Sequence, residues 1–136
     1  MKSDQRQRVL LVDDHDDARQ MYAEYLEYSG FETVQAANGL EALRRAQEHH
    51  PDIVVMDLSL PVMDGWEATR RLKADERTAS IPILALSGQV LLDGSLRAKL
   101  ASFDGFVTKP CLPEDLIVEI RRLLDAGASP DQPVCH

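Results

Sequence analysis

Five short apolar segments recur along this chain of 136 residues, and they constrain its fold more than any other feature. In chain order they are Val9–Val12, a weaker one at Phe31–Gln35, Ile53–Met56, Ile83–Leu86, and a weaker one at Phe106–Thr108. An apolar run of this length without polar alternation is typical of a strand buried on both faces of its sheet. We therefore predict a sheet that is covered on both sides.

Segments with helical spacing separate these runs. The expected helices contain Ala18, Met21, Tyr22, Tyr25 and Leu26, ended by Gly30; Leu40, Leu43 and Ala46, capped by Asn38 with Glu41; Trp66 to Leu72; Leu96 to Leu100; and Leu116 to Leu124, opened by Pro113. Strands that alternate with helices imply a parallel sheet, and right-handed crossovers restrict it to a doubly wound α/β fold. The flavodoxin-like order 2-1-3-4-5 is the common five-stranded solution, although the sequence does not itself specify the order.

The composition indicates one globular domain, expected at residues 9–125 between flexible ends at 1–8 and 126–136. A net charge of −8 argues against nucleic acid and anionic lipid as partners. The longest apolar runs are about four residues, against the ~20 that a membrane span needs. Cys111 and Cys135 form neither a disulfide framework nor a metal-ligand cluster, so a reduced cytoplasmic domain is expected.

Polar side chains follow four of the five predicted strands at the point where each ends. Asp13 and Asp14 follow the first strand, Asp57 the third, Ser87 the fourth and Lys109 the fifth. The carboxyl ends of parallel strands meet at one edge, where α/β sheets bind their ligands. We therefore expect three carboxylates, a hydroxyl and an ammonium group to converge on one site.

Three neighbouring carboxylates repel one another unless a cation lies between them, and Mg²⁺ is a hard cation that binds carboxylates and phosphate oxygens together. The nearby Lys109 and Ser87 suit a phosphoryl group, for which an aspartate can serve as nucleophile. Alone, the pair Asp13 and Asp14 could instead cap the first helix. His15 beside them is interpreted as a solvent-facing helix residue in preference to a metal ligand.

Five motifs in this order resemble the receiver domain of two-component response regulators over about residues 8–125. They are Asp13-Asp14, Asp57, the loop Leu60-Pro61-Val62-Met63-Asp64-Gly65, Ser87-Gly88 and Lys109-Pro110. The resemblance implies that Asp57 accepts a phosphoryl group from a phosphohistidine on a sensor histidine kinase or a histidine phosphotransfer protein. It also implies that Asp14, Asp57 and the backbone carbonyl of Ser59 bind Mg²⁺ directly, with Asp13 acting through water.

By the same resemblance, Lys109 binds a phosphoryl oxygen, Ser87 swings toward the phosphoryl group and Phe106 turns inward behind it. This switch would reshape the face of the fourth helix, fifth strand and fifth helix for a downstream protein. The Lys109-Pro110 bond is expected to be cis, and Ser59 and Gln89 flank the site and could tune the lifetime of the phosphoryl group. Ser87 stands where the family more often has Thr, and Phe106 lacks the hydroxyl of a tyrosine.

Other functions remain open at this point. An aspartyl phosphatase would place a second acid two residues after its nucleophile, where this chain has Ser59. A flavin-binding domain would need a phosphate-binding loop after the first strand. This chain has acids there, which would repel the phosphate. A metal-independent receiver is a further alternative. Within the receiver interpretation, a protein–protein signal, a phosphorelay, a phosphate sink and a fragment of a hybrid kinase are all possible. No turnover of an external substrate is expected.

Overall fold

The computed structural model describes residues 6–58, 65–87, 103–108 and 112–128. The described strands are β1 (Arg8–Val12), β2 (Glu32–Ala36), β3 (Ile53–Asp57), β4 (Ile83–Ser87) and β5 (Gly105–Thr108). The described helices are α1 (Asp16–Tyr28), α2 (Gly39–His49), α3 (Gly65–Ala74) and α5 (Pro113–Ala128). All five predicted strands are confirmed, although β2 lies one residue further along than the predicted run Phe31–Gln35. The helix expected around 96–100 lies outside the described residues.

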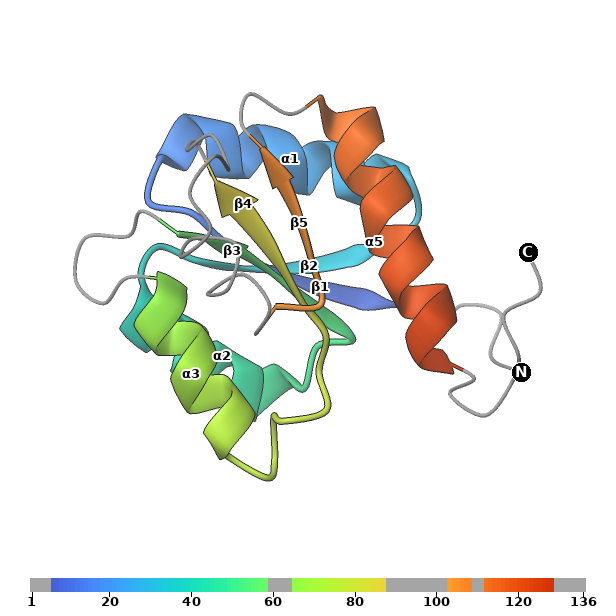
Figure 1. Ribbon diagram of the computed structural model, residues 1–136. Coiled ribbons are helices and arrows are strands. Elements are labelled where there is room, and N and C mark those ends of the chain that lie inside the picture. Colours follow the sequence, from blue (N-terminus) through green and yellow to red (C-terminus); the bar gives the residue numbers. More distant parts are fainter. Residues whose placement is uncertain (1–5, 59–64, 88–102, 109–111, 129–136) are drawn as a thin grey trace.

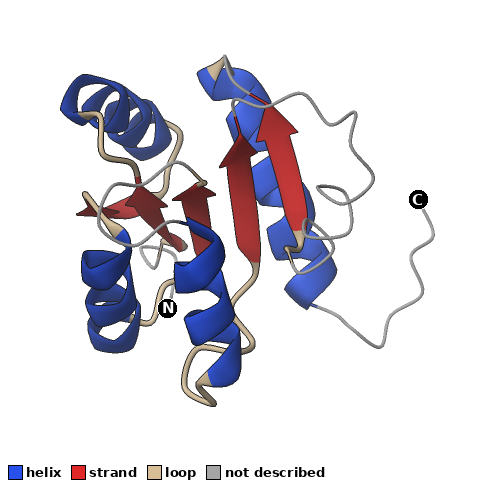
Figure 2. Ribbon diagram, turned by 60° about the vertical axis from the view of Figure 1, so that its left-hand side comes forward, coloured by secondary structure: helices blue, strands red, loops and turns tan. Residues whose placement is uncertain are grey.

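The strands, drawn as red arrows in Figure 2, form one parallel sheet. Its order is β2-β1-β3-β4-β5, which confirms the doubly wound topology. The first and third strands lie side by side near the centre, with Val12 paired to Met56. One residue further, Asp57 is paired to Leu86 of β4. All the strands therefore end at the same edge of the sheet, which we call the carboxyl edge.

Helices cover both faces of the sheet, with α1 and α5 on one face and α2 and α3 on the other (Figure 1). Alternate residues of each strand point to opposite faces. In β1, Leu10 packs with the α2 and α3 side, whereas Leu11 packs with the α1 and α5 side. Because both faces are buried, each position needs an apolar side chain, which explains the unalternated runs of the sequence.

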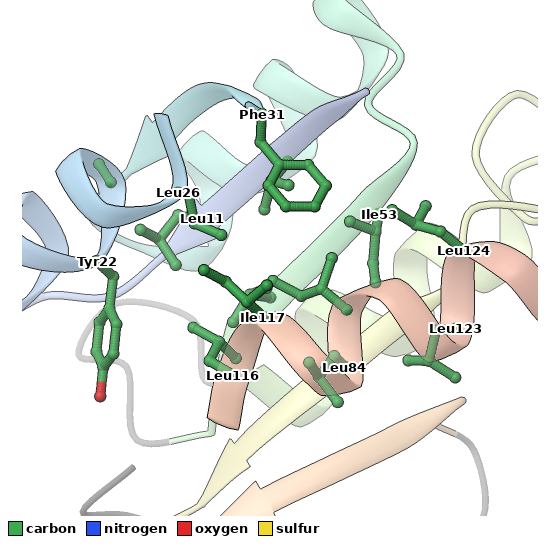
Figure 3. Close-up of a cluster of buried hydrophobic side chains, with 14 of the residues drawn as sticks. Leu11, Tyr22, Leu26, Phe31, Ile53, Leu84, Leu116, Ile117, Leu123 and Leu124 are labelled. Carbon is green, nitrogen blue, oxygen red and sulfur yellow. The ribbon is translucent and has the colours of Figure 1, made fainter. Parts of the chain in front are cut away.

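The core beneath α1 and α5 is drawn in Figure 3. Leu26 of α1 and Leu116 of α5 meet Leu11 and Leu84 of the sheet there, and all four are almost fully buried (Figure 3). The stripe predicted for the last helix is buried over its whole length; it comprises Leu116, Ile117, Ile120, Leu123 and Leu124. Pro113 is the first residue of α5, as expected, and the helix continues to Ala128.

Local signals explain where α2 begins and ends. The Asn38 side chain accepts a hydrogen bond from the Glu41 backbone N–H at 2.9 Å, and Glu41 Oε1 accepts one from the Ala37 N–H at 2.8 Å. This reciprocal cap is the predicted one. The helix ends at His49, and His50 adopts a left-handed conformation with φ of 47°.

The apolar stripe proposed for α1 is partly wrong. Met21 is 44% exposed and Tyr25 38% exposed, whereas the buried stripe of this helix is Tyr22, Ala23 and Leu26. The three- and four-residue spacing fits two neighbouring stripes of α1 equally well, and packing against the sheet selects one of them.

At the opposite edge of the sheet, which we call the amino edge, Arg8 connects β1 to Asp52, His49 and Glu32. Its backbone N–H donates to Asp52 Oδ2 at 2.7 Å, and its carbonyl accepts from the Asp52 N–H at 2.8 Å. Its guanidinium donates to the His49 carbonyl at 2.6 Å and pairs with Glu32 at 3.3 Å. Arg8, which the sequence places in the N-terminal segment, is thus the first residue of β1. None of the described helices combines the length and apolarity needed to cross a membrane.

Candidate functional site

Acidic residues from the two central strands lie together at the carboxyl edge. Asp13 directly follows β1, and Asp57 is the last residue of the neighbouring β3. Each of Asp13, Asp14, His15 and Asp57 offers one ligand atom, and these atoms all lie within 4.8 Å of one another. The structure therefore brings together the three carboxylates that the sequence predicts.

Two of these carboxylates are deeply buried. Asp13 and Asp57 are each 1% exposed, whereas the Asp14 side chain is 29% exposed and opens the group to solvent. Such burial is rare for an acid unless a partner compensates its charge. Among the described residues of the site, Asp13 and Asp57 are thus enclosed and Asp14 is accessible to solvent.

The turn from β1 to α1 positions the acids through its own hydrogen bonds. The Asp13 N–H donates to the Ala36 carbonyl at 3.1 Å, which continues the pairing of β1 with β2 by one residue. Asp13 Oδ1 then accepts the backbone N–H of His15 at 2.9 Å. His15 occupies the cap position of α1, so the hypothesis that Asp13 and Asp14 cap this helix is wrong.

Arg19 supports this turn from the first turns of α1. Its guanidinium donates to the Asp13 carbonyl at 2.6 Å, to Asp16 Oδ1 at 2.8 Å and to Gln35 Oε1 at 2.9 Å. The side chain is 15% exposed. It therefore connects the end of β1, the first turn of α1 and β2 next to the acidic group.

Two buried carboxylate oxygens of the site lack a hydrogen-bond donor among the described residues. Asp13 Oδ2 and Asp14 Oδ1 are buried and accept no hydrogen bond from any residue that the structure describes. A buried acceptor left in this state costs free energy. An oxygen-only set of closely spaced carboxylates suits a hard divalent cation such as Mg²⁺, so the residues present fit the predicted metal.

Gly65 makes room for the backbone that carries Asp57. A Cβ atom at this first position of α3 would clash with the Asp57 carbonyl oxygen and would lie 2.9 Å from the Leu58 Cα. Only glycine allows α3 to start this close to the end of β3. The residue belongs to the loop motif singled out in the sequence, and the structure explains why glycine stands there.

The remaining predicted site residues are described only in part. Ser87 is the last residue of β4, and its backbone is paired in register with Thr108 of β5. Phe106 lies on β5 and is 42% exposed. The other four lie outside the described residues; they are Ser59, Gln89, Lys109 and Pro110.

Sequence reasoning missed Arg19 entirely and underrated His15. His15 is solvent-facing, with a side chain that is 68% exposed, but its Nδ1 lies 3.2 Å from both Asp13 Oδ1 and Asp14 Oδ1. The sequence signal for this contact is the position of His15 directly after two acids. Nothing in the periodicity of α1 points to the long-range contact between Arg19 and Gln35.

Comparison with known proteins places this geometry in a family. Residues 9–121 match the model of the response regulator receiver domain. The chain is 34% identical over 116 residues to the polar-differentiation response regulator DivK of Brucella ovis, covering 85% of this chain and 94% of that protein.

Solved structures agree with this match. Vibrio cholerae chemotaxis protein CheY4 superposes with a TM-score of 0.80 at 32% identity, covering 88% of this chain and 99% of that one. The receiver domain of the sensor histidine kinase PA1611 of Pseudomonas aeruginosa superposes with a TM-score of 0.81 at 29% identity, covering 89% and 99%. That structure holds a magnesium ion coordinated in its active site cleft.

The strand order, the acidic group and the family match over residues 9–121 all agree. Receiver domains receive their phosphoryl group from histidine kinase systems and do not turn over an external substrate. The chain belongs to the response regulator receiver domain family, whose members are phosphorylated on an aspartate with Mg²⁺.

Proposed function

We propose that Asp57 is the phosphoacceptor of this receiver domain and that a phosphohistidine on a sensor histidine kinase or histidine phosphotransfer protein is the donor. One observation carries the assignment. Asp57 ends a central strand, is 1% exposed and has its carboxylate within 4.8 Å of ligand atoms of Asp13 and Asp14. An acid at this place can meet a phosphoryl group and a cation together.

In the proposed reaction, a carboxylate oxygen of Asp57 attacks the phosphorus atom. The new P–O bond forms an acyl phosphate, the P–N bond breaks, and the imidazole leaves with the electron pair and takes up a proton. Asp14, Asp57 and the Ser59 carbonyl would hold Mg²⁺, with Asp13 acting through water, and the ion neutralises the developing charge when bound. Lys109 would bind a phosphoryl oxygen as a second positive charge.

The proposed output is a change of surface. Ser87 at the end of β4 would turn toward the phosphoryl group, and Phe106 on β5 would turn inward behind it. Support comes from the 42% exposure of Phe106, because an inward rotation would remove apolar surface from water. A downstream protein would bind the face around β5 and α5 in the cytoplasm.

The test is the intact-protein mass after incubation with Mg²⁺ and a small acyl-phosphate donor. The unmodified chain should gain one phosphoryl group, and Asp57→Asn should gain none because an amide is a poor nucleophile. Asp125→Asn, on the exposed side of α5, is the matched control and should be labelled like the unmodified chain.

Circular dichroism of Asp57→Asn must show an intact fold for the comparison to count. Undiminished labelling of that variant would refute the assignment. Release of many equivalents of phosphate per chain from a phosphomonoester would instead favour the aspartyl phosphatase alternative.

A further inference from the structure

His15 lies where a side chain can reach the proposed cation. It occupies the cap position of α1, yet its side chain makes no capping hydrogen bond to the helix. The ring is turned to the acids instead, with Nδ1 at 3.2 Å from Asp13 Oδ1 and at 3.2 Å from Asp14 Oδ1. At 68% exposure, burial does not fix the side chain in this orientation.

The spacing of the atoms matches a coordination shell. Around an octahedral ion with bonds of about 2.1 Å, neighbouring ligand atoms lie about 3 Å apart and opposite ones about 4.2 Å apart. The two 3.2 Å distances from His15 Nδ1 fit neighbouring positions, and the 4.8 Å limit over all four residues leaves room for opposite ones. A hydrogen bond from Nδ1 fits the same distances, and a cation would take the place of that proton.

The hydrogen bonding of the carboxylate oxygens is a second observation that points to a bound cation. Asp13 is 1% exposed, and its Oδ2 accepts no hydrogen bond within the described parts of the chain. The buried Oδ1 of Asp14 accepts none either, and His15 Nδ1 lies 3.2 Å from it. His15 therefore lies next to buried carboxylate oxygens that a cation could bind. Solvent reaches this group at Asp14, whose side chain is 29% exposed.

We propose that His15 Nδ1 is an additional ligand of this cation site and shifts its preference from Mg²⁺ toward Mn²⁺ and Co²⁺. The inference rests on the proposed function, since it assumes that the acidic group binds a divalent ion. Imidazole nitrogen is a softer ligand than carboxylate and raises affinity for transition metals much more than for Mg²⁺. An all-oxygen site would discriminate far less.

Calorimetric titrations of the untagged chain with Mg²⁺, Mn²⁺ and Co²⁺ test the selectivity. His15→Ala should raise the Kd for Mn²⁺ and Co²⁺ about tenfold and the Kd for Mg²⁺ less than about twofold. His49→Ala is the matched control, because it removes an imidazole at the end of α2 and should leave all three values unchanged. These metals avoid the thiol preference of softer ions for Cys111 and Cys135.

A spectroscopic readout separates coordination from positioning. Electron spin echo modulation of bound Mn²⁺ should show a directly coordinated ¹⁴N in the unmodified chain and in His49→Ala, and none in His15→Ala. Absence of the ¹⁴N signal in the unmodified chain overturns the proposal. Equal loss of Mg²⁺ and Mn²⁺ affinity in His15→Ala overturns it too, since His15 would then only orient the acids.

The two proposals fail in different ways. If acyl phosphate labels Asp57 with Mg²⁺ but the metal preference does not depend on His15, only the present inference is wrong. If the unmodified chain binds none of the three ions and Asp57 is not labelled, the proposed function is wrong as well.

Discussion

Arg19 joins three parts of the molecule through one guanidinium. It holds the Asp13 carbonyl at the end of β1, Asp16 in the first turn of α1 and Gln35 on β2. Because Arg19 holds the Asp13 carbonyl, the backbone that carries the Asp13 carboxylate has less freedom to move away from its neighbours. At the residue scale, Arg19 is therefore a positioning residue for the acidic group.

Arg19→Ala should weaken both the fold and the cation site. We expect the free energy of unfolding to fall by about 1–3 kcal/mol, since hydrogen bonds from a charged group are lost. The Kd for Mg²⁺ should rise about tenfold, as is common when a supporting contact of a ligand is removed. Urea denaturation and calorimetric titration measure the two effects.

The control is Arg122→Ala on α5, where the arginine pairs with Glu119 of the same helix and its side chain is 57% exposed. It should change the unfolding free energy by less than about 0.5 kcal/mol and leave the Mg²⁺ affinity unchanged. If Arg19→Ala binds Mg²⁺ as tightly as this control does, Arg19 stabilises the fold without positioning the acids.

The sequence predicts the acids of the site but not the contacts that His15 and Arg19 make with them. Asp13, Asp14 and Asp57 can be placed because each follows an apolar run, and parallel strands end at one edge. The orientation of the His15 ring and the contact of Arg19 with Gln35 depend on how α1 packs beside β2. That packing is a tertiary property, which local spacing does not contain.

Two elements, β3 and α3, meet at Gly65 in a contact that leaves no space for a side chain. The helix begins against the backbone of Asp57 and Leu58, so we expect a shift of its start to move the strand that carries the proposed phosphoacceptor. At this scale, the shape of the site depends on a backbone approach and not on any polar group.

Gly65→Ala should therefore harm stability and phosphorylation together. Overpacking of this kind costs about 1–3 kcal/mol of unfolding free energy, and the shift of the Asp57 backbone should slow labelling by acyl phosphate. Gly30→Ala provides the contrast. Gly30 has φ of 104° and nothing within 4 Å of a Cβ, so that variant should lose about 1–2 kcal/mol through its backbone alone and be labelled normally. Normal labelling of Gly65→Ala would contradict the coupling.

Glu67 of α3, whose side chain is 35% exposed, makes the stability of the fold depend on pH. Hydrogen bonds from Arg70 and Arg71 lower the pKa of Glu67 from 4.5 to about 2. A carboxyl whose pKa is lower in the folded state stabilises the fold above its unfolded pKa and loses this effect as pH falls through the folded value. Its contribution should thus be complete above pH 4.5 and disappear toward about pH 2.

Glu67→Gln tests this dependence. The difference in unfolding free energy between the unmodified chain and the variant should stay constant above about pH 5 and shrink between pH 4.5 and 2, as measured by urea denaturation at each pH. A difference that is the same at pH 5 and at pH 3 would show that the arginines do not hold this carboxylate.

Element boundaries illustrate what the pattern of apolar residues can locate. The runs place all five strands, but β3 and β4 each extend one residue further, to Asp57 and Ser87, because backbone pairing continues where the side chains become polar. In α1 the spacing selected Met21 and Tyr25, which are exposed. Apolar spacing identifies a helix, and only the neighbouring sheet decides which stripe is buried.

Across the whole molecule, the acidic group is a cost to stability that a cation offsets. Asp13 and Asp57 are buried beside Asp14 in a chain that already carries a net charge of −8. Like charges in a small buried group repel, and functional sites commonly hold such unfavourable arrangements. Binding of a cation to the folded state alone then raises stability by mass action.

Asp13→Asn should therefore raise the metal-free unfolding free energy by about 0.5–2 kcal/mol and abolish most of the rise in Tm that Mg²⁺ produces. The amide oxygen can still accept the His15 N–H, so the turn should survive. Asp52→Ala at the amino edge removes the acceptor of the Arg8 N–H and should do the opposite, with lower stability and an intact Mg²⁺ effect. The Tm of each variant, measured by thermal unfolding with and without Mg²⁺, tests both predictions. A lower metal-free stability of Asp13→Asn would refute the repulsion argument.

The Arg8 contacts at the amino edge have a consequence for engineering. They join β1, β2, the end of α2 and the residue before β3, a full strand length away from the acids. Substitutions that strengthen this fastening can make the domain more robust to heat while its chemistry is left alone. Because the amino edge lies at the opposite end of the strands from the acids, it offers positions where stability can be changed without a direct effect on the acidic group.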